Sequence, residues 1–590
     1  MGIRRSRRLE VSRENVTLGE HSPARKGGGS EHSPARKGGG ERVEVPETPP
    51  SRAGLSVGLS VGLSGSATAR TCSRRHPSAK LRDVAACAMW LATAVCGGHV
   101  GAVANAGTVQ IAVVDENAQP LPCRIHLKDQ AGKPQRAAGL PFFRDHFSCP
   151  GNVELQLNAG SYTFEVERGP EYQRHSGSFE LAGSAEKKID VRLERIADLA
   201  AQRWYSGDLH VHRPVEEMEL LMQAEDLHVA PVITWWNNQN RWADRKPPHD
   251  PVLEFTGKRF CDVMAGEDER EGGALLYFGR RRPLAITGAG REHPSPMQFL
   301  EQAQRRGDGW IDVEKPFWWD VPVWLASGQI DSIGLANNHM CRSTMLANEA
   351  WGKPRDAKRL PPPLGNGYWT QEIYYHVLNC GLRVPPSAGS ASGVLPNPVG
   401  YDRVYVHVGR EFNNRRWWQG LKAGRSFVTN GPLLICRANG RLPGHVFTGQ
   451  QGDEIKIEIE ASLTTLDNVP AIEIVKNGRV ERAVPPDRLK ATGGLGSVTF
   501  RESGWFLVRA ITDNKQTFRF ASTAPFYVEI GSSRRRISKG SAQFFLDWVN
   551  ERAKRVEASL KDPQKLREVL VYHERAKVFW QDMLAGANAE

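Results

Sequence analysis

The sequence predicts a multidomain chain of α/β plus β class: a distorted (β/α) barrel flanked by two β-sandwich domains, with a C-terminal helical segment. Three observations predict this organisation. Short alternating runs separated by turns fill residues 107–198 and return in 431–530, which indicates two β-sandwiches. Strand-like and helical runs alternate within 204–430, which is typical of an α/β barrel. Residues 541–585 carry an amphipathic helical pattern.

The first 106 residues differ in composition from the rest. Residues 1–70 are rich in Gly, Ser, Pro and Arg and repeat the segment EHSPARKGGG at 20–29 and 31–40, so we expect a disordered extension. In 71–106, basic residues precede the apolar run 84–96, and Ala104-Asn-Ala106 follows it. This order is typical of a secretory signal peptide cleaved near Ala106, with translation starting near residues 70–80. The alternative is an interior hydrophobic helix.

The positive charge lies mostly in the same region. The chain carries a net charge of +12, and residues 1–106 hold 16 Lys and Arg against 8 Asp and Glu. The remaining chain is therefore only weakly basic, and we expect no nucleic-acid partner. Beyond residue 106 no apolar run reaches the length of a membrane span. We therefore expect an exported, periplasmic or extracellular mature protein without a stable span; its oligomeric state does not follow from the sequence.

The mature chain would begin near Gly107 with the first sandwich, in which Thr108–Val114 and Tyr162–Val166 are clear alternating strands. It resembles the carboxypeptidase-regulatory-like sandwiches that precede catalytic domains in exported enzymes. We predict no chemistry in it. Cys123 and Cys149 are possible disulfide partners, but the sequence leaves their pairing open.

The stretch Trp204–His212 opens the barrel and carries the clearest chemical signal. Asp208, His210 and His212 alternate with Leu209 and Val211, so a strand would place three polar side chains on one face. Imidazole nitrogens and carboxylate oxygens together suit a divalent transition metal: zinc, manganese or iron. The alternative is a strand whose histidines face solvent or a satisfied core.

Polar and aromatic residues follow the next predicted strands, where active sites of such barrels gather. Twelve of the 16 tryptophans lie between Trp204 and Trp418. Tryptophan rings and Asn amides suit sugar-like ligands, although tryptophans also pack barrel rims. We predict substrate-binding roles for Trp235, Trp236, Asn237, Trp318, Trp319, Asn337 and Asn338.

With these residues assembled, 204–430 resembles the PHP (polymerase and histidinol phosphatase) metallohydrolases, most closely the exported CehA/McbA-type branch. The Gly207-Asp-Leu-His-Val-His212 motif carries most of the resemblance. It implies a PHP-like distorted (β/α) barrel in which His210 and His212 bind metal and Glu267 is the bridging carboxylate. A metal-activated water would attack an ester or phosphoester.

The chain departs from the family pattern elsewhere. Thr234-Trp-Trp236 replaces Thr-Asp-His, Glu314-Lys-Pro316 replaces Ala-His-Pro, and Gly389-Ser-Ala-Ser-Gly393 lacks the final Asp and His. The small residues of this last segment could let its backbone approach a ligand closely. The ligand set is therefore degenerate.

Adding Asp208, Glu314 and His339 could complete one metal site, with Lys315 as a charge-stabilising group; we assign catalytic roles to Glu267, Lys315 and His339. Two hypotheses remain. One is an exported metal-dependent hydrolase acting on a small-molecule or glycan-linked ester or phosphoester. The other is a catalytically inactive barrel serving as a secreted carbohydrate-binding or interaction protein.

The C-terminal part is predicted to be a second sandwich followed by helices. Ile455–Glu460 and Trp505–Ala510 alternate as strands, and Asn477-Gly478 is a hairpin signal. In 541–585, Phe544, Phe545, Trp548 and Val549 form an apolar stripe that we expect to pack on the preceding domain.

Overall fold

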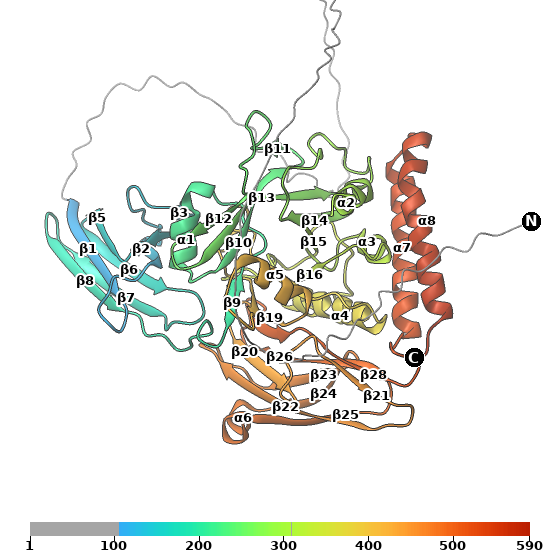
Figure 1. The fold of residues 1–590 in the computed structure, drawn as a ribbon. Helices are drawn as coiled ribbons and strands as arrows, with labels where there is room; N and C mark the ends of the chain where they lie inside the picture. The colour runs from blue at the N-terminus through green and yellow to red at the C-terminus, as the bar shows by residue number, and fades with distance from the viewer. Residues whose placement is uncertain (1–105, 308) are drawn as a thin grey trace, which may run out of the picture. The chain divides into compact units, whose positions relative to one another are not determined.

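The computed structural model describes residues 106–307 and 309–590. The predicted extension 1–70 and signal-peptide segment 71–106 fall outside this range, except for Ala106. The described chain is built mainly of β-strands in several sheets, with few helices and a C-terminal helical segment (Figure 1). This confirms the predicted β-rich, multi-sheet organisation and its helical end.

Two sheets pack face to face in the N-terminal part. Hydrophobic side chains of both, such as Val109, Ile125 and Phe147, are fully buried in one core. Alternation explains this, since every second residue of a strand points to the same face. The first sheet has the order β5 (Asn152–Asn158), β1 (Ala106–Val114), β8 (Glu186–Arg192). The second has the order β3 (Phe142–Phe143), β4 (His146–Cys149), β2 (Cys123–Asp129), β6 (Gly160–Glu167), β7 (His175–Leu181).

The central strands belong to a hydrogen-bonded network that closes on itself. They are β9 (Trp204–Gly207), β10 (Val229–Trp236), β11 (Gln239–Asn240), β12 (Val252–Phe255), β13 (Arg259–Arg270), β14 (Gly273–Phe278), β15 (Trp310–Val313), β16 (Ser332–Asn337), β17 (Pro386–Gly389), β18 (Arg403–His407) and β19 (Ser426–Thr429). β10 is parallel to β13, and β16 lies parallel between β15 and β17, whereas β14 is antiparallel to β13 and β15. Val211 bridges Val232 and Ser392, so the segment after β9 lies between β10 and the end of β17.

Helices are fewer than a regular alternation would give. They are the short 3-10 helix η1 (Val215–Glu217), α1 (Met218–Ala224), α2 (Pro296–Arg305), α3 (Val321–Ala326), α4 (Gly365–Asn379) and α5 (Asn414–Lys422). η1 and α1 follow each other directly and form the first helical segment after β9. The segment Gly266–Arg270, which contains Glu267, lies within β13 because it pairs with β14.

The C-terminal strands again enclose an apolar core. β20 (Leu433–Ala438), β22 (Ile455–Thr464) and β25 (Gly494–Phe500) form one sheet. The others join the closed network: β21 (Val446–Gly449), β23 (Ile472–Lys476), β24 (Arg479–Val484), β26 (Gly504–Ile511), β27 (Phe520–Thr523) and β28 (Phe526–Ile530). A short helix, α6 (Pro486–Thr492), lies between β24 and β25. Asn477 and Gly478 have φ of 50° and 86° in the β23–β24 turn, which confirms the predicted hairpin.

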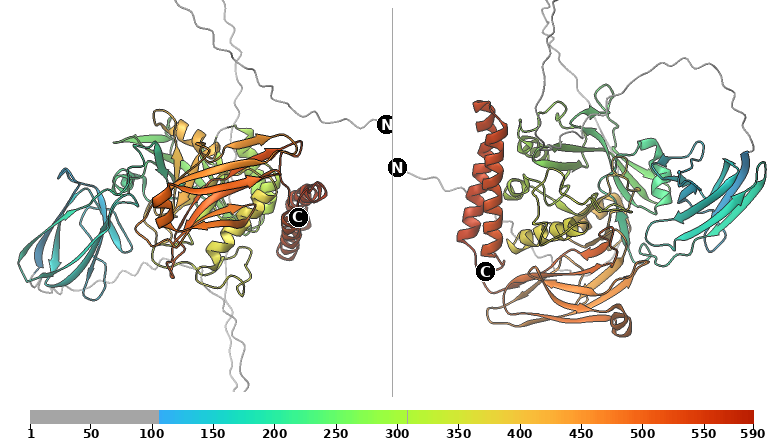
Figure 2. Two further views of the ribbon diagram at one scale, coloured as in Figure 1. Left: turned by 90° about the horizontal axis from the view of Figure 1, so that it is seen from below. Right: turned by 180° about the vertical axis from the view of Figure 1, so that it is seen from behind.

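The chain ends in two long helices, α7 (Lys539–Ser559) and α8 (Pro563–Ala585), which lie side by side (Figure 2). Phe545, Trp548 and Val549 are buried, as the apolar stripe predicts. α7 contacts α3 and α4, and α8 contacts α3, all in the central part of the chain, whereas the stripe was expected to pack on the preceding domain. Arg552 explains part of this docking, because its guanidinium reaches Asp320 at 2.6 Å and Glu292 at 2.5 and 2.9 Å.

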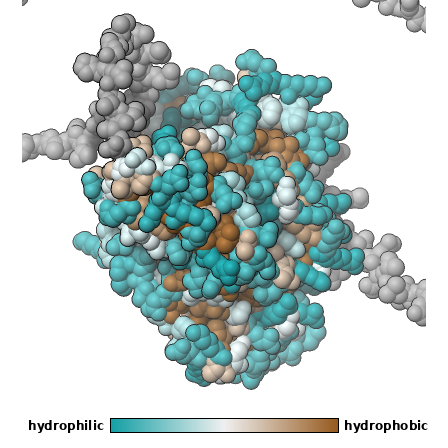
Figure 3. All heavy atoms as spheres, turned by 90° about the vertical axis from the view of Figure 1, so that its left-hand side faces the viewer, coloured by the Kyte–Doolittle hydropathy of each residue, from teal (hydrophilic) through white to brown (hydrophobic). Residues whose placement is uncertain are grey.

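No helix among the described residues is both long and apolar enough to cross a membrane. On the face shown in Figure 3, hydrophilic residues predominate and hydrophobic residues occur in separate groups.

Candidate metal centre

The segment that carries the two histidines lies between two parts of the closed network. β9 ends at Gly207, and the N–H groups of Leu209 and His212 donate to the carbonyls of Ala388 and Ser392. The Gly389–Gly393 segment comes very close: a Cβ built on Gly389 would lie 2.4 Å from the Cβ of His210. Glycine is therefore required there because the backbone packs directly against His210; the expected close approach of this backbone to a ligand stays a prediction.

His210, His212 and Glu267 converge on one point. The two Nε2 atoms lie 2.9 Å apart, and the Glu267 carboxylate oxygens lie 3.5 Å from His210 Nε2 and 3.2 Å from His212 Nε2. Two atoms bound at about 2.0–2.1 Å to one ion are about 2.9 Å apart at a right angle and about 3.3 Å at a tetrahedral angle. The three spacings therefore fit the ligand atoms of a single divalent metal.

Glu314 was predicted to be a metal ligand, but it contacts the site through His210. Its Oε1 lies 3.3 Å from Nδ1 of His210, the ring nitrogen opposite the one that faces His212 and Glu267. A carboxylate in this position fixes the imidazole tautomer and ring orientation of a metal ligand. The structure thus places Glu314 as an orienting partner of His210 and not as a direct ligand.

Glu314 is itself held by hydrogen-bond donors. It accepts from Trp318 Nε1 and from Asn338 Nδ2, each at 2.8 Å, and it contacts the Lys315 ammonium. Lys315 also lies 4.6 Å from the centre of the Trp318 ring. Lys315 and Asn338 therefore lie next to the candidate centre through Glu314, and their catalytic and substrate-binding roles stay predictions.

The charges around the three converging side chains depend on one another. Burial would lower the pKa of His210, but the Glu267 and Glu314 carboxylates raise it to about 10. Burial opposes ionisation of Glu267, yet His210 and His212 hold its pKa well below the usual range. Burial likewise opposes ionisation of Glu314, but Lys315 and His210 lower its pKa to about 2. Without a metal, His210 therefore favours its protonated form, in which one ring nitrogen faces Glu267 and the other faces Glu314.

His212 offers a neutral imidazole to this group. Burial lowers its pKa, and among the described residues its Nδ1 has no hydrogen-bond partner. Its ring lies 4.5 Å from that of Trp236. Trp236 and Asn237 are half-buried, so the site approaches solvent on this side.

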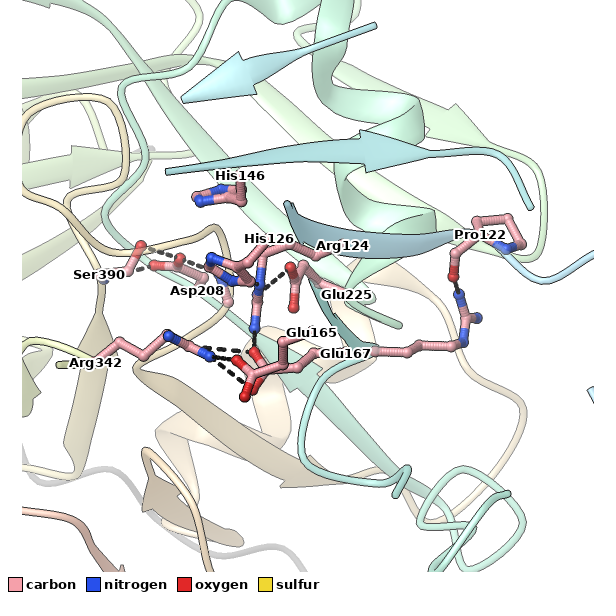
Figure 4. Close-up of polar contacts among 12 residues, drawn as sticks. Pro122, Arg124, His126, His146, Glu165, Glu167, Asp208, Glu225, Arg342 and Ser390 are labelled. Atoms are coloured by element: carbon pink, nitrogen blue, oxygen red, sulfur yellow. Dashed lines mark hydrogen bonds and ion pairs between the residues drawn. The ribbon is translucent and has the colours of Figure 1, made fainter. Parts of the chain in front are cut away.

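Asp208 is not among the converging ligand atoms. Its Oδ1 accepts from the backbone N–H of His210 at 3.1 Å and of Ser390 at 3.0 Å, and its Oδ2 accepts from Gly400 at 2.7 Å. Ser390 Oγ also donates to Oδ2 at 2.5 Å (Figure 4). The Asp208 carboxylate thus accepts hydrogen bonds that fix the surrounding backbone, and this geometry does not support its predicted role as a metal ligand.

Of the other predicted residues, some lie near the candidate centre and others hold the backbone around it. His339 Nδ1 lies 3.0 Å from the carbonyl of Asn348, and burial together with Lys315 lowers the pKa of His339 to about 3. Asn337 accepts from the backbone N–H of His339 at 3.2 Å. Asn237 is held by Asp268, to which it donates at 2.7 Å. His339 is therefore a neutral, buried side chain near Lys315, whereas Asn337 and Asn237 shape loops.

Three of the four tryptophans that we predicted to bind substrate are buried. Trp235, Trp318 and Trp319 are at most 2% exposed, and only Trp236 is half-buried. Trp235 packs on Gly266 and donates to the Met264 carbonyl at 2.9 Å. Trp319 lies under α7, where the Arg555 guanidinium is 4.3 Å from its ring. These rings fill the core because neighbouring strands and helices cover them, which periodicity cannot reveal.

Glu269 is a site residue that the sequence did not lead us to predict. It lies two residues beyond Glu267 on β13 and therefore on the same face. Burial and the nearby Glu267 raise its pKa to about 7. The period-2 spacing from Glu267 could have indicated this residue.

Two further groups of potential ligands, both containing His126, were likewise not predicted. Their other members are Asp145 with His146, and Glu165 with Glu167. His126 accepts from Arg124 Nε at its Nε2 (3.0 Å) and faces Asp145 at its Nδ1 (3.2 Å). Because the guanidinium always donates, Nδ1 must carry the ring proton, and neither nitrogen is free for a metal. These groups fit a metal less well than the His210, His212 and Glu267 group.

Comparisons with known proteins identify no family. No family model matches the sequence, and no curated protein matches it. Among solved structures, the Bacillus anthracis TIE protein aligns over 18% of this chain and 18% of its own, at 16% identity and a TM-score of 0.13. The N-terminal four Ig domains of Dscam1 isoform 1.9 align over 72% of this chain and 73% of theirs, at 7% identity and a TM-score of 0.13. Likeness at this level assigns neither fold nor function, so the candidate metal centre is described by its own geometry alone.

Proposed function

We propose that this protein is an exported metal-dependent hydrolase of the PHP type, acting on an ester, phosphoester or glycan-linked small molecule. The observation that carries the proposal is the convergence of His210, His212 and Glu267 at spacings of 2.9–3.5 Å. Neutral imidazoles and a carboxylate are the usual ligands of zinc, manganese and iron at hydrolytic sites.

Each nearby side chain has a role in this proposal. His210, His212 and Glu267 hold the ion, and Glu314 orients His210 through Nδ1. A bound divalent metal would supply an acidified water and polarise the bond to be cleaved. Lys315 adds positive charge beside the site, where a phosphoester or a developing oxyanion would need it. Three protein ligands leave coordination positions open, which is typical of catalytic rather than structural sites.

The sequence supports the same proposal. The resemblance of Gly207–His212 to the opening motif of the PHP metallohydrolases agrees with the histidines of the trio. The missing family ligands at Trp235, Trp236 and Ser390–Gly393 favour one metal over a two- or three-metal cluster. The signal-like segment 71–106 supports export. The carbohydrate-binding alternative depends on exposed rings, and the burial of Trp235, Trp318 and Trp319 removes most of that support.

Metal content tests the proposal directly. Elemental analysis of the purified protein should find about one equivalent of zinc, manganese or iron per chain. His210→Ala/His212→Ala should lose it, whereas His249→Ala, an exposed histidine without an assigned role, should retain it. Chelation should abolish hydrolysis of aryl esters or phosphoesters, and added metal should restore it. Wild-type protein that holds no metal even after reconstitution would overturn the proposal.

A further inference from the structure

A second feature lies away from the metal trio, where the N-terminal sheets meet the loops before β18, after β19 and after β22. A partly open cavity of about 70 Å³ lies there. One buried water needs roughly 10–15 Å³ of such volume, so the cavity has room for several waters or a small polyatomic ion. It opens near Arg174 and Leu466, which are exposed side chains of its lining.

The lining of this cavity is strongly charged and unbalanced. It contains three carboxylates, Glu167, Glu225 and Asp467, and five guanidinium groups: Arg124, Arg174, Arg342, Arg403 and Arg519. Glu165 lies just outside and also pairs with Arg342 and Arg174. Even when Glu165 is counted, the guanidinium groups outnumber the carboxylates by one.

Three of these guanidinium groups meet at one carboxylate, Glu167. Glu167 contacts the guanidinium groups of Arg124 and, at 2.9 Å, of Arg342 (Figure 4). It also contacts the guanidinium group of Arg174 at 2.6 Å. Arg124 also pairs with Glu225, and Arg174 and Arg342 also pair with Glu165, but three guanidinium groups still carry more N–H donors than these three carboxylates can accept from. Like charges gathered at the wall of a partly buried cavity repel one another at low effective dielectric. An additional anion in the cavity would relieve this repulsion.

Guanidinium groups also determine which anion fits. Their planar donor fork matches the oxygens of phosphate and related oxyanions. The cavity volume of about 70 Å³ suits a small anion. We propose that this cavity binds a small tetrahedral oxyanion of the phosphate or sulfate class, at a site separate from the metal trio.

Calorimetric titration with inorganic phosphate at low ionic strength tests this proposal. Wild-type protein should bind one phosphate per chain, and sulfate should compete with it. Arg174→Ala should weaken phosphate binding by about tenfold or more, because it removes one charge-assisted hydrogen-bond donor. Arg174 is exposed, so the variant should fold, and its thermal unfolding would verify this.

Two controls distinguish phosphate binding in this cavity from binding elsewhere on the protein. Arg192→Ala makes the same change of charge on exposed β8, outside the cavity, and should leave the affinity unchanged. The His210→Ala/His212→Ala variant should also bind phosphate normally, whether or not the proposed hydrolase function is correct. Absence of binding to wild type, or equal binding by Arg174→Ala, would show that the arginines form only a structural charge network. Loss of phosphate binding in the double histidine variant would show that phosphate binds at the metal centre, and it would refute the proposed cavity site.

Discussion

Glu314→Gln is the sharpest test of how the candidate metal centre is built. The carboxylate lies 3.3 Å from His210 Nδ1, while the metal-facing Nε2 points to His212 and Glu267. The other partners of Glu314 in the described chain are donors, including Trp318 Nε1 and Asn338 Nδ2. An amide NH₂ at this position would face a donor, and the negative charge that fixes the His210 tautomer would be lost.

The expected loss follows from the role of such partners. Removing an outer carboxylate that orients a metal-binding histidine costs about 10–100-fold in metal affinity, or roughly 1.4–2.8 kcal/mol. Glu267→Gln removes a direct ligand and should lose more. Competition for zinc against a chromophoric chelator measures both affinities, and the absorption spectrum of the cobalt-substituted protein reports whether the ligand set has changed.

Lys315→Met is the matched control, since it removes the ammonium from Glu314 but leaves the Glu314–His210 contact. Its metal affinity should remain near that of wild type. If Glu314→Gln bound metal as tightly as wild type, the orienting role would be refuted. If it lost metal as completely as Glu267→Gln, Glu314 would be a direct ligand, as the sequence predicted.

Two further predictions concern stability. Arg552→Met should destabilise the protein by about 3–5 kcal/mol in chemical denaturation, because Asp320 and Glu292 would remain as buried, unpaired carboxylates. Lys353→Ala is the control: it breaks the ion pair with Glu551, whose side chain is half exposed, and should lower the free energy of unfolding by at most about 1 kcal/mol. Equal losses for the two variants would contradict this reasoning. Burial lowers the pKa of His228 from 6.5 to about 4. As the pH drops from 6.5 to 4, the unfolded chain therefore binds a proton at this residue while the folded chain does not. The free energy of unfolding should fall over this range by up to about 3 kcal/mol because of this residue. His228→Asn should flatten the stability profile in that window, and an unchanged slope would show that this histidine contributes nothing to acid unfolding.

The sequence predicted well those features that depend on local pattern. Period-2 alternation located strands such as Ile455–Glu460 within β22 and Trp505–Ala510 within β26. The Asn477-Gly478 turn and the C-terminal helices also follow from local chemistry. The residue types that converge at the metal centre, His210, His212 and Glu267, were recognisable by spacing and resemblance.

What failed depends on contacts between distant segments. The segment Asp208–His212 was expected to continue a strand, but the strand ends at Gly207 and Asp208 binds the backbone of Ser390 and Gly400 instead. The role of Glu314 depends on which ring nitrogen of His210 it meets, and no periodicity encodes that choice. The burial of Trp319 depends on α7, more than two hundred residues away in the chain.

The Asp208 contacts have a consequence for the order of folding. The carboxylate joins the His210 backbone to amides 182 and 192 residues further along the chain. Contacts of such long sequence separation form late, because the loop between them must close first. During synthesis from the N-terminus, His210 and His212 would leave the ribosome long before residues 390–400 can fix them. The centre should therefore acquire its geometry only when the strand network closes, which would limit metal capture by incomplete chains.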